Sequence, residues 1–163
     1  MKVESCVGEG TEISLYLPCE KGKDATFQKG SLELQKGNEL ILLVDDEPSV
    51  QFVVGDMLEE LGYSVITASN GAEGLEKYKK HRDSVQLVIL DMMMPVMDGR
   101  ECLVKLREFD SEVKVLVASG FSPGKELEKC LDLGIQGFLQ KPFLLSSLAD
   151  HVSCALRLTT MKT

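Results

Sequence analysis

From residue 38 onward, the chain alternates between short apolar runs and stretches with helical spacing. Leu40–Val44 and Leu87–Leu90 are continuous apolar runs, which are typical of strands buried on both faces of a parallel sheet. Ser64–Ala68, Val113–Ala118 and Gly137–Gln140 read as three further strands. The pattern therefore predicts five strands, each separated from the next by a segment of another kind.

Between the predicted strands, apolar residues recur three and four positions apart, as on one face of a helix. Pro48 suits the first position of a helix, and Gly62 can end that helix. Asn70 and Asp98 are each followed three residues later by Glu, which is the spacing of a capping box. The predicted helices span residues 48–61, 70–80, 98–109, 122–133 and 144–156.

Strands that alternate with helices at this spacing imply a parallel sheet covered by helices on both faces. The prediction is an α/β fold, a (βα)₅ doubly wound sheet of five parallel strands. Its common solution is the flavodoxin-like strand order 2-1-3-4-5, in which the functional site lies between the ends of strands 1 and 3.

The amino-terminal stretch has a different character. Residues 1–18 contain a glycine-rich turn and an alternating strand at Ile13–Leu17, for which no partner is evident nearby. This stretch resembles the last glycine-rich box and final strand of the histidine-kinase ATP-binding domain, which implies a remnant of that domain. Residues 19–37 are polar and rich in Lys and Gly, so we expect a linker.

Composition narrows the class of protein. The 163 residues have a net charge of −8, which argues against nucleic acid or an anionic membrane surface as a partner. The five cysteines show no metal or disulfide spacing, so we expect a reducing cytoplasm. No apolar run is long enough for a membrane span, and no signal peptide is evident.

Polar residues gather where the predicted strands end. Asp45 and Asp46 follow strand 1, Asp91 follows strand 3, Ser119 follows strand 4 and Lys141 follows strand 5. Three neighbouring carboxylates repel one another unless a cation lies among them, and Mg²⁺ prefers carboxylate oxygens together with water and phosphate. The set therefore predicts a magnesium site that handles a phosphoryl group on Asp91.

Residues 38–158 resemble the receiver domain of two-component response regulators. We expect residues 159–163 to be a tail that follows this domain. The segments with that resemblance are LILLVDDEP, LVILDMMMPVMDG, VLVASGFS and GFLQKPF. The resemblance implies that Asp91 is the phosphoacceptor, Ser119 the switch hydroxyl and Lys141 the phosphate-contacting lysine. It also implies a cis bond between Lys141 and Pro142 and an aromatic switch position at Phe138.

The resemblance further implies a reaction and partners. Asp91 would take a phosphoryl group from a phosphohistidine, with Mg²⁺ bound by Asp46, Asp91 and the Met93 carbonyl, and by Asp45 mainly through water. The donor would be a histidine-kinase dimerisation domain or a histidine phosphotransfer protein. The fragment would catalyse only its own phosphorylation and dephosphorylation, as the C-terminal receiver of a cytoplasmic or membrane-anchored bacterial hybrid kinase. An unpartnered strand at Ile13–Leu17 could also pair with the same strand of a second copy, which would give a homodimer.

Three alternatives stay open at this point. An aspartyl-nucleophile phosphatase would need a second acid two residues after Asp91, where this chain has Met93. A flavin- or nucleotide-binding protein would need a phosphate-cradling loop after strand 1, where this chain has an acidic run. A receiver that docks proteins without being phosphorylated is harder to separate by sequence.

Overall fold

The computed structural model describes residues 2–6, 8, 10–14, 37–120 and 130–157. It divides the chain into two compact units, Met1–Leu32 and Glu33–Thr163, and each is described by itself. Apart from Gly37, the predicted linker lies outside the described residues, as does the predicted tail.

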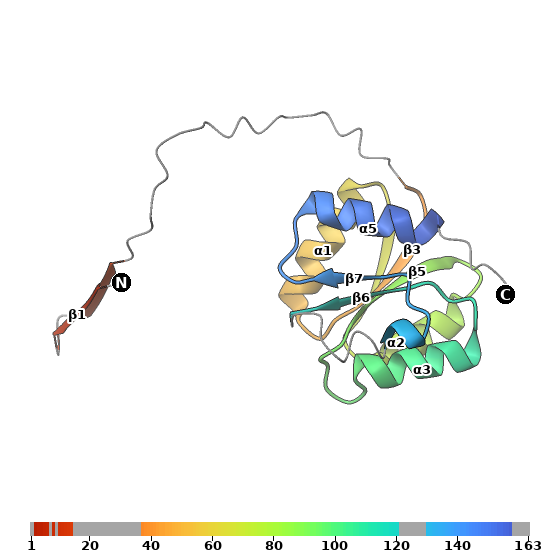
Figure 1. Cartoon of the computed structure of the whole chain (residues 1–163), viewed down its shortest axis with the longest axis horizontal. Helices are drawn as coiled ribbons and strands as arrows, with labels where there is room; N and C mark the ends of the chain where they lie inside the picture. The colour runs from red at the N-terminus through yellow and green to blue at the C-terminus, as the bar shows by residue number, and fades with distance from the viewer. Residues whose placement is uncertain (1, 7, 9, 15–36, 121–129, 158–163) are drawn as a thin grey trace. The chain divides into compact units, whose positions relative to one another are not determined.

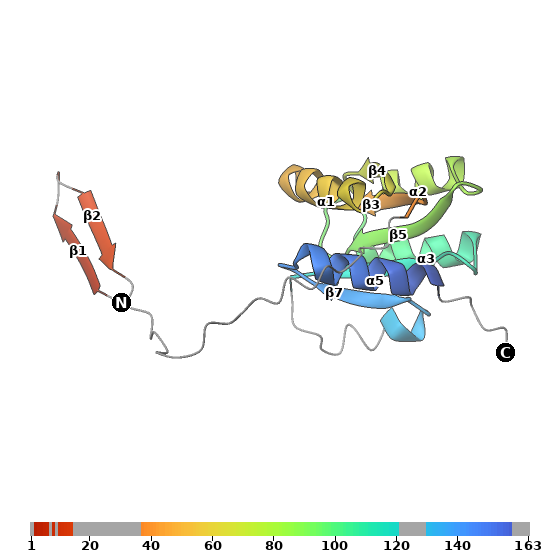
Figure 2. The same cartoon turned by 90° about the horizontal axis from the view of Figure 1, so that it is seen from above.

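The larger unit contains the predicted five-stranded parallel sheet. Its strands are β3 (Leu40–Val44), β4 (Ser64–Ala68), β5 (Val85–Asp91), β6 (Val115–Ser119) and β7 (Gly137–Gln140). They lie side by side in the order β4-β3-β5-β6-β7, and all four pairings are parallel (Figure 2). This is the predicted order 2-1-3-4-5, and it makes β3 and β5 neighbours at the centre of the sheet.

Helices cover both faces of this sheet (Figure 1). The helices are α1 (Pro48–Glu60), α2 (Gly71–Lys80), α3 (Gly99–Phe109) and α5 (Leu145–Arg157). Residues of α1 and α5 share one buried cluster with the sheet, and residues of α2 and α3 share another. No helix among the described residues is long and apolar enough to cross a membrane.

The predicted helix ends are confirmed by their capping contacts. Asn70 and Asp98 each accept a hydrogen bond at the side chain from the backbone N–H three residues later, at 3.0 and 2.8 Å. Gly62 follows α1 with φ at 91°, a conformation that glycine adopts without strain. The sheet and its helices therefore begin and end close to the positions that local sequence chemistry dictates.

Some boundaries differ from the prediction. β5 begins at Val85 and includes Asp91, and β6 begins at Val115 and includes Ser119, because Asp91 pairs with Ala118 and Ser119 with Gln140. Both polar residues are thus the last residues of their strands instead of the first residues after them. Of the predicted helix at residues 122–133, only the carboxyl end, from Cys130, lies within the described residues.

The expectation of an unpartnered amino-terminal strand was wrong. β1 (Lys2–Cys6) pairs antiparallel with β2 (Gly10–Ser14), with Lys2 opposite Ser14 and Cys6 opposite Gly10. β1 contains a single large apolar residue, Val3, so apolar alternation did not reveal it. The rest of the predicted strand, from residue 15, lies outside the described residues.

Candidate functional site

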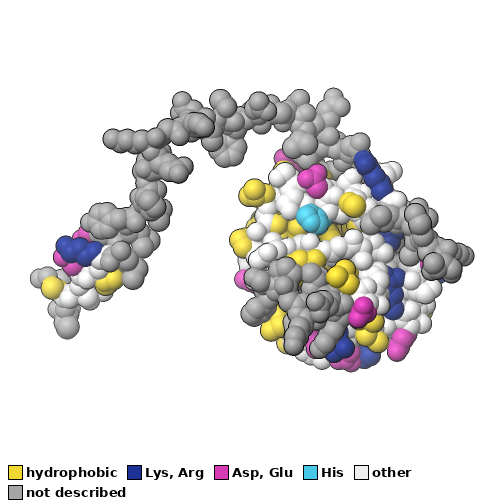
Figure 3. Space-filling model, in the orientation of Figure 1, with side chains coloured by type: hydrophobic (Ala, Val, Ile, Leu, Met, Phe, Trp, Pro, Cys, Tyr) yellow, Lys and Arg dark blue, Asp and Glu magenta, His cyan; other side chains and the backbone are white. Residues whose placement is uncertain are grey.

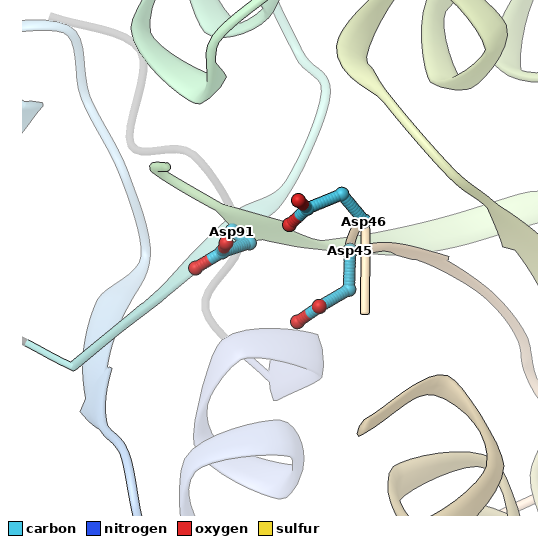
Figure 4. Close-up of side chains that lie close together, drawn as sticks. All are labelled: Asp45, Asp46 and Asp91. Carbon is cyan, nitrogen blue, oxygen red and sulfur yellow. The ribbon is translucent and has the colours of Figure 1, made fainter. Parts of the chain in front are cut away.

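Three carboxylates meet at the carboxyl edge of the sheet. Asp91 ends β5, and Asp45 and Asp46 follow the neighbouring strand β3, so the parallel pairing brings them together. One oxygen from each carboxylate lies within 4.8 Å of the others (Figure 4). Asp45 and Asp91 are only 2% and 6% exposed, whereas Asp46 is exposed to solvent. The cluster therefore has a buried floor and one solvent-facing side.

A single lysine bridges the two buried carboxylates. The Nζ of Lys141 lies 2.5 Å from an Asp45 oxygen and 3.1 Å from an Asp91 oxygen. Its backbone N–H donates to the Ser119 carbonyl at 2.8 Å, which fixes the loop after β7 to the end of β6. The Lys141–Pro142 bond is cis, as predicted. One ammonium among three carboxylates leaves the cluster with an excess of negative charge.

Burial and the neighbouring charges together shift the pKa values of the two groups that form the buried ion pair, Asp91 and Lys141. Burial raises the pKa of Asp91, and the negative charge of Asp45 adds to that rise, while Lys141 partly offsets it. For Lys141, burial lowers the pKa, but the ion pairs with Asp45 and Asp91 outweigh burial and raise it overall. A second cation at this edge would stabilise the ionised form of Asp91.

The carboxylates differ in how many of their oxygens are already engaged. One Asp45 oxygen accepts from Lys141, and the other accepts from the backbone N–H of Glu47 at 3.0 Å. Among the described residues, no hydrogen bond engages the Asp46 carboxylate. Oxygen ligands from Asp46 and Asp91, with Asp45 acting through water, match the preference of Mg²⁺ for a few carboxylates and several waters. The donor set therefore fits this ion.

The structure also gives positions for the remaining predicted site residues. Ser119 is 7% exposed and follows Ala118, the residue that pairs with Asp91. Phe138 in β7 pairs with Val117 and packs against the buried cluster on the α2–α3 face. Met93 lies two residues after Asp91 and is 62% exposed. The roles assigned to these residues, and the metal contact of the Met93 carbonyl, stay predictions.

One residue that supports the site escaped the sequence reasoning. Gly99 donates its backbone N–H to the Met92 carbonyl at 3.2 Å, and a Cβ built on it would lie 2.1 Å from the carbonyl oxygen of Asp91. Only glycine allows α3 to begin this close to the backbone of Asp91. The sequence indicates that Asp98 caps the following helix, but nothing local in the sequence signals the distant contact of Gly99.

A flavodoxin-like α/β fold with three carboxylates and a lysine at the carboxyl edge defines the class of protein. The chain belongs to the response regulator receiver domain family, whose model matches residues 41–153. It is therefore a receiver domain of two-component signalling, a phosphorylation switch.

Individual relatives agree with the family match. The chain is 36% identical to the chemotaxis protein CheY of Treponema pallidum, over 72% of this chain and 82% of that protein. It is 32% identical to the sensor kinase CckA of Brucella abortus, over 91% of this chain but only 17% of the kinase. The fold matches a chain of the CheX–CheY–BeF₃–Mg²⁺ complex of Borrelia burgdorferi with a TM-score of 0.68 and 31% identity, covering 70% of this chain and 86% of that one.

Proposed function

We propose that this receiver accepts a phosphoryl group from a phosphohistidine onto Asp91. The observation that supports this proposal most strongly is the placement of Asp91. Its carboxylate is buried, lies 3.1 Å from the Lys141 ammonium and shares an edge with two further acids. A buried carboxylate beside a lysine at the carboxyl edge of the sheet is the arrangement expected of a nucleophile that receives an anionic group.

In the proposed reaction, an Asp91 oxygen attacks phosphorus in line, the P–O bond of an acyl phosphate forms, and the P–N bond to the donor imidazole breaks. Lys141 favours the ionised form of Asp91 before the attack and then pairs with a phosphoryl oxygen. Bound Mg²⁺ would supply charge neutralisation for the transferring group, and Asp46, Asp91 and the Met93 carbonyl would hold it. Attack of water on the same phosphorus later returns Asp91 to a free carboxylate.

The same site would drive the switch. The new charge on Asp91 would draw the Ser119 hydroxyl toward a phosphoryl oxygen. Because Ser119 pairs with Gln140 and Val117 pairs with Phe138, a shift at the end of β6 passes directly to β7. Phe138 has no hydroxyl, so its part in the response would be a change of packing alone.

The surface beside Lys141 supports a protein donor. A groove of about 460 Å³ lies between α1 and the loop after β7, and its lining includes Val53, Met57, Lys141 and Phe143. Phe52 on α1 is 70% exposed and Leu144 is 75% exposed. Hydrophobic side chains are visible over α1 on the face shown in Figure 3. Apolar surface next to the nucleophile suits a helical partner that brings a phosphohistidine to Asp91.

The wider context is proposed to be a hybrid histidine kinase in the cytoplasm, with this receiver at its carboxyl end. The match to the sensor kinase CckA covers 91% of the chain, so it cannot be confined to residues 33–163 and must include part of the amino-terminal unit. The hairpin of β1 and β2 has its described side chains exposed, and two strands alone are marginally stable. Both facts support a further sheet in the parent protein. The receiver itself would catalyse only its own phosphorylation and dephosphorylation.

Phosphorylation of an Asp91→Asn variant tests the proposal. With acetyl phosphate and Mg²⁺, the wild-type chain should incorporate phosphate that is labile in alkali, and Asp91→Asn should incorporate none. Asp98→Asn is the matched control, because it changes a nearby acid but keeps an efficient helix cap. Undiminished labelling of Asp91→Asn would refute the assignment, and an unlabelled wild-type chain that still binds a kinase would favour a docking-only receiver.

A further inference from the structure

The side chain of Gln51 holds the loop that bears Asp45 and Asp46 against the end of the sheet. Gln51 lies in the first turns of α1, and its amide Nε2 donates to the Asp45 carbonyl at 2.6 Å and to the Ala68 carbonyl at 3.3 Å. Ala68 ends β4, and its carbonyl also accepts the backbone N–H of Asp45 at 3.0 Å. One amide group thus joins α1 to the carboxyl ends of two adjacent strands.

The position of the Asp45 carbonyl determines the orientation of the peptide that leads to Asp46. Its carbon and oxygen lie in the same rigid peptide plane as the nitrogen of Asp46. A hydrogen bond that fixes this oxygen therefore fixes the orientation of the peptide from which Asp46 departs. The Asp46 carboxylate itself is exposed and has no hydrogen bond of its own among the described residues. The direction of this carboxylate consequently depends on its backbone.

We propose that Gln51 is a positioning residue for the cation site: by holding the Asp45–Asp46 peptide plane, it aims the Asp46 carboxylate at the Asp91 side of the cluster. The inference rests on the proposed Mg²⁺-dependent function. The Gln51 amide donates to backbone carbonyls and not to a carboxylate of the cluster, so it would act on the cation site through the backbone of Asp45. Removing its amide leaves all three carboxylates and Lys141 in the chain but lets the peptide between Asp45 and Asp46 rotate.

Gln51→Met is the direct test, because methionine keeps the length and helix propensity of glutamine and lacks its donor. Gln86→Met is the matched control. The Gln86 side chain accepts the backbone N–H of Leu40 at 3.0 Å, so it also contacts the β3 backbone, but at the end of the strand opposite to Asp45. Both variants lose side-chain hydrogen bonds to the backbone, but only Gln51→Met loses one beside the carboxylate cluster.

Magnesium affinity is measured without any phosphodonor, by following backbone amide shifts of residues 45–47 in NMR titrations of the full chain with MgCl₂. Gln51→Met should raise the Mg²⁺ Kd roughly tenfold, the lower end of the effects seen for residues behind metal ligands. Gln86→Met should leave the Kd unchanged. In acetyl phosphate labelling, Gln51→Met should raise the Mg²⁺ concentration for half-maximal rate while the rate at saturating Mg²⁺ stays near that of the wild type.

Thermal unfolding of both variants shows whether a change in Mg²⁺ Kd arises from a lost stability of the fold or from a lost orientation of Asp46. A Kd for Gln51→Met within twofold of the wild-type value overturns the inference, and so does an equal rise in Kd for both variants. Failure of the wild-type chain itself to bind Mg²⁺ at millimolar concentrations overturns the proposed function and this inference together. That result is distinct from the others, because it is seen before any variant is made.

Discussion

Gly99→Ala is expected to damage the site without changing any group that takes part in the chemistry. The added Cβ would lie 2.1 Å from the Asp91 carbonyl oxygen and 2.7 Å from the Met92 Cα. Both neighbours are backbone atoms, so no side chain can rotate away. Relief of the overlap requires the start of α3 and the end of β5 to separate.

The size of the effect follows from these distances. Real Cβ atoms essentially never lie closer than 3.0 Å to another heavy atom, so the contact must open from 2.1 to at least 3.0 Å, a shift of 0.9 Å or more. Overpacking of this kind costs about 1–3 kcal/mol of unfolding free energy. A displacement near 1 Å of a reacting group lowers rates by roughly 100-fold. Because the displaced backbone belongs to Asp91, we expect both losses.

The assays are urea denaturation and the initial rate of phosphate incorporation from acetyl phosphate at saturating Mg²⁺. Gly55→Ala is the matched control, since a Cβ on Gly55 in α1 meets nothing within 4 Å. That substitution should stabilise the chain by about 0.5–1 kcal/mol and leave the labelling rate unchanged. A Gly99→Ala protein that is as stable as the wild type and labels within threefold of its rate would refute the reasoning.

Three further predictions concern other parts of the receiver. Val96 has φ at 69° in a turn where the Met97 N–H donates to the Pro95 carbonyl at 2.8 Å, so Val96→Gly should raise the unfolding free energy by about 1 kcal/mol; a loss in urea denaturation would contradict this. Tyr78 is buried and donates to Asp110 at 3.0 Å; burial, the hydrogen bond and the negative charge of Asp110 raise its pKa above the ordinary value of 10.0. The folded protein therefore keeps this proton longer than the unfolded chain, and stability should fall as pH rises above 10.0, less steeply in Tyr78→Phe; parallel pH profiles would refute the assignment. Phe52→Ser should slow transfer from a phosphorylated donor roughly tenfold and leave labelling by acetyl phosphate unchanged, and equal effects on both donors would exclude α1 as the docking surface.

The fold was predictable because local signals agree with one another throughout the larger unit. Apolar runs placed the strands, and Asn70, Asp98 and Gly62 placed helix ends that the structure confirms. The ends of β5 and β6 differ from the prediction, because Asp91 and Ser119 are polar but still pair within the sheet. The hairpin partner of β2 was missed because Lys2–Cys6 is mostly polar and its pairing depends on backbone hydrogen bonds that leave no apolar pattern.

The site was predictable only as a set of residue types at strand ends. The topology alone brings Asp45, Asp46, Asp91 and Lys141 together, and the structure confirms that they meet. The supporting contacts were not predictable, since the approach of Gly99 to Asp91 and the bonds of Gln51 to Asp45 depend on how helices pack against the sheet. Sequence periodicity reports which face of a helix is buried, but not which backbone atoms it touches.

Direct identification of the phosphorylated residue tests the central claim. Borohydride reduces an aspartyl phosphate to homoserine, so reduction of the chain after treatment with acetyl phosphate and Mg²⁺, followed by tandem mass spectrometry, locates the modified position. We predict homoserine at residue 91 and at no other acid. Homoserine at Asp45, Asp46 or Asp98, or its absence from every position, would contradict the account.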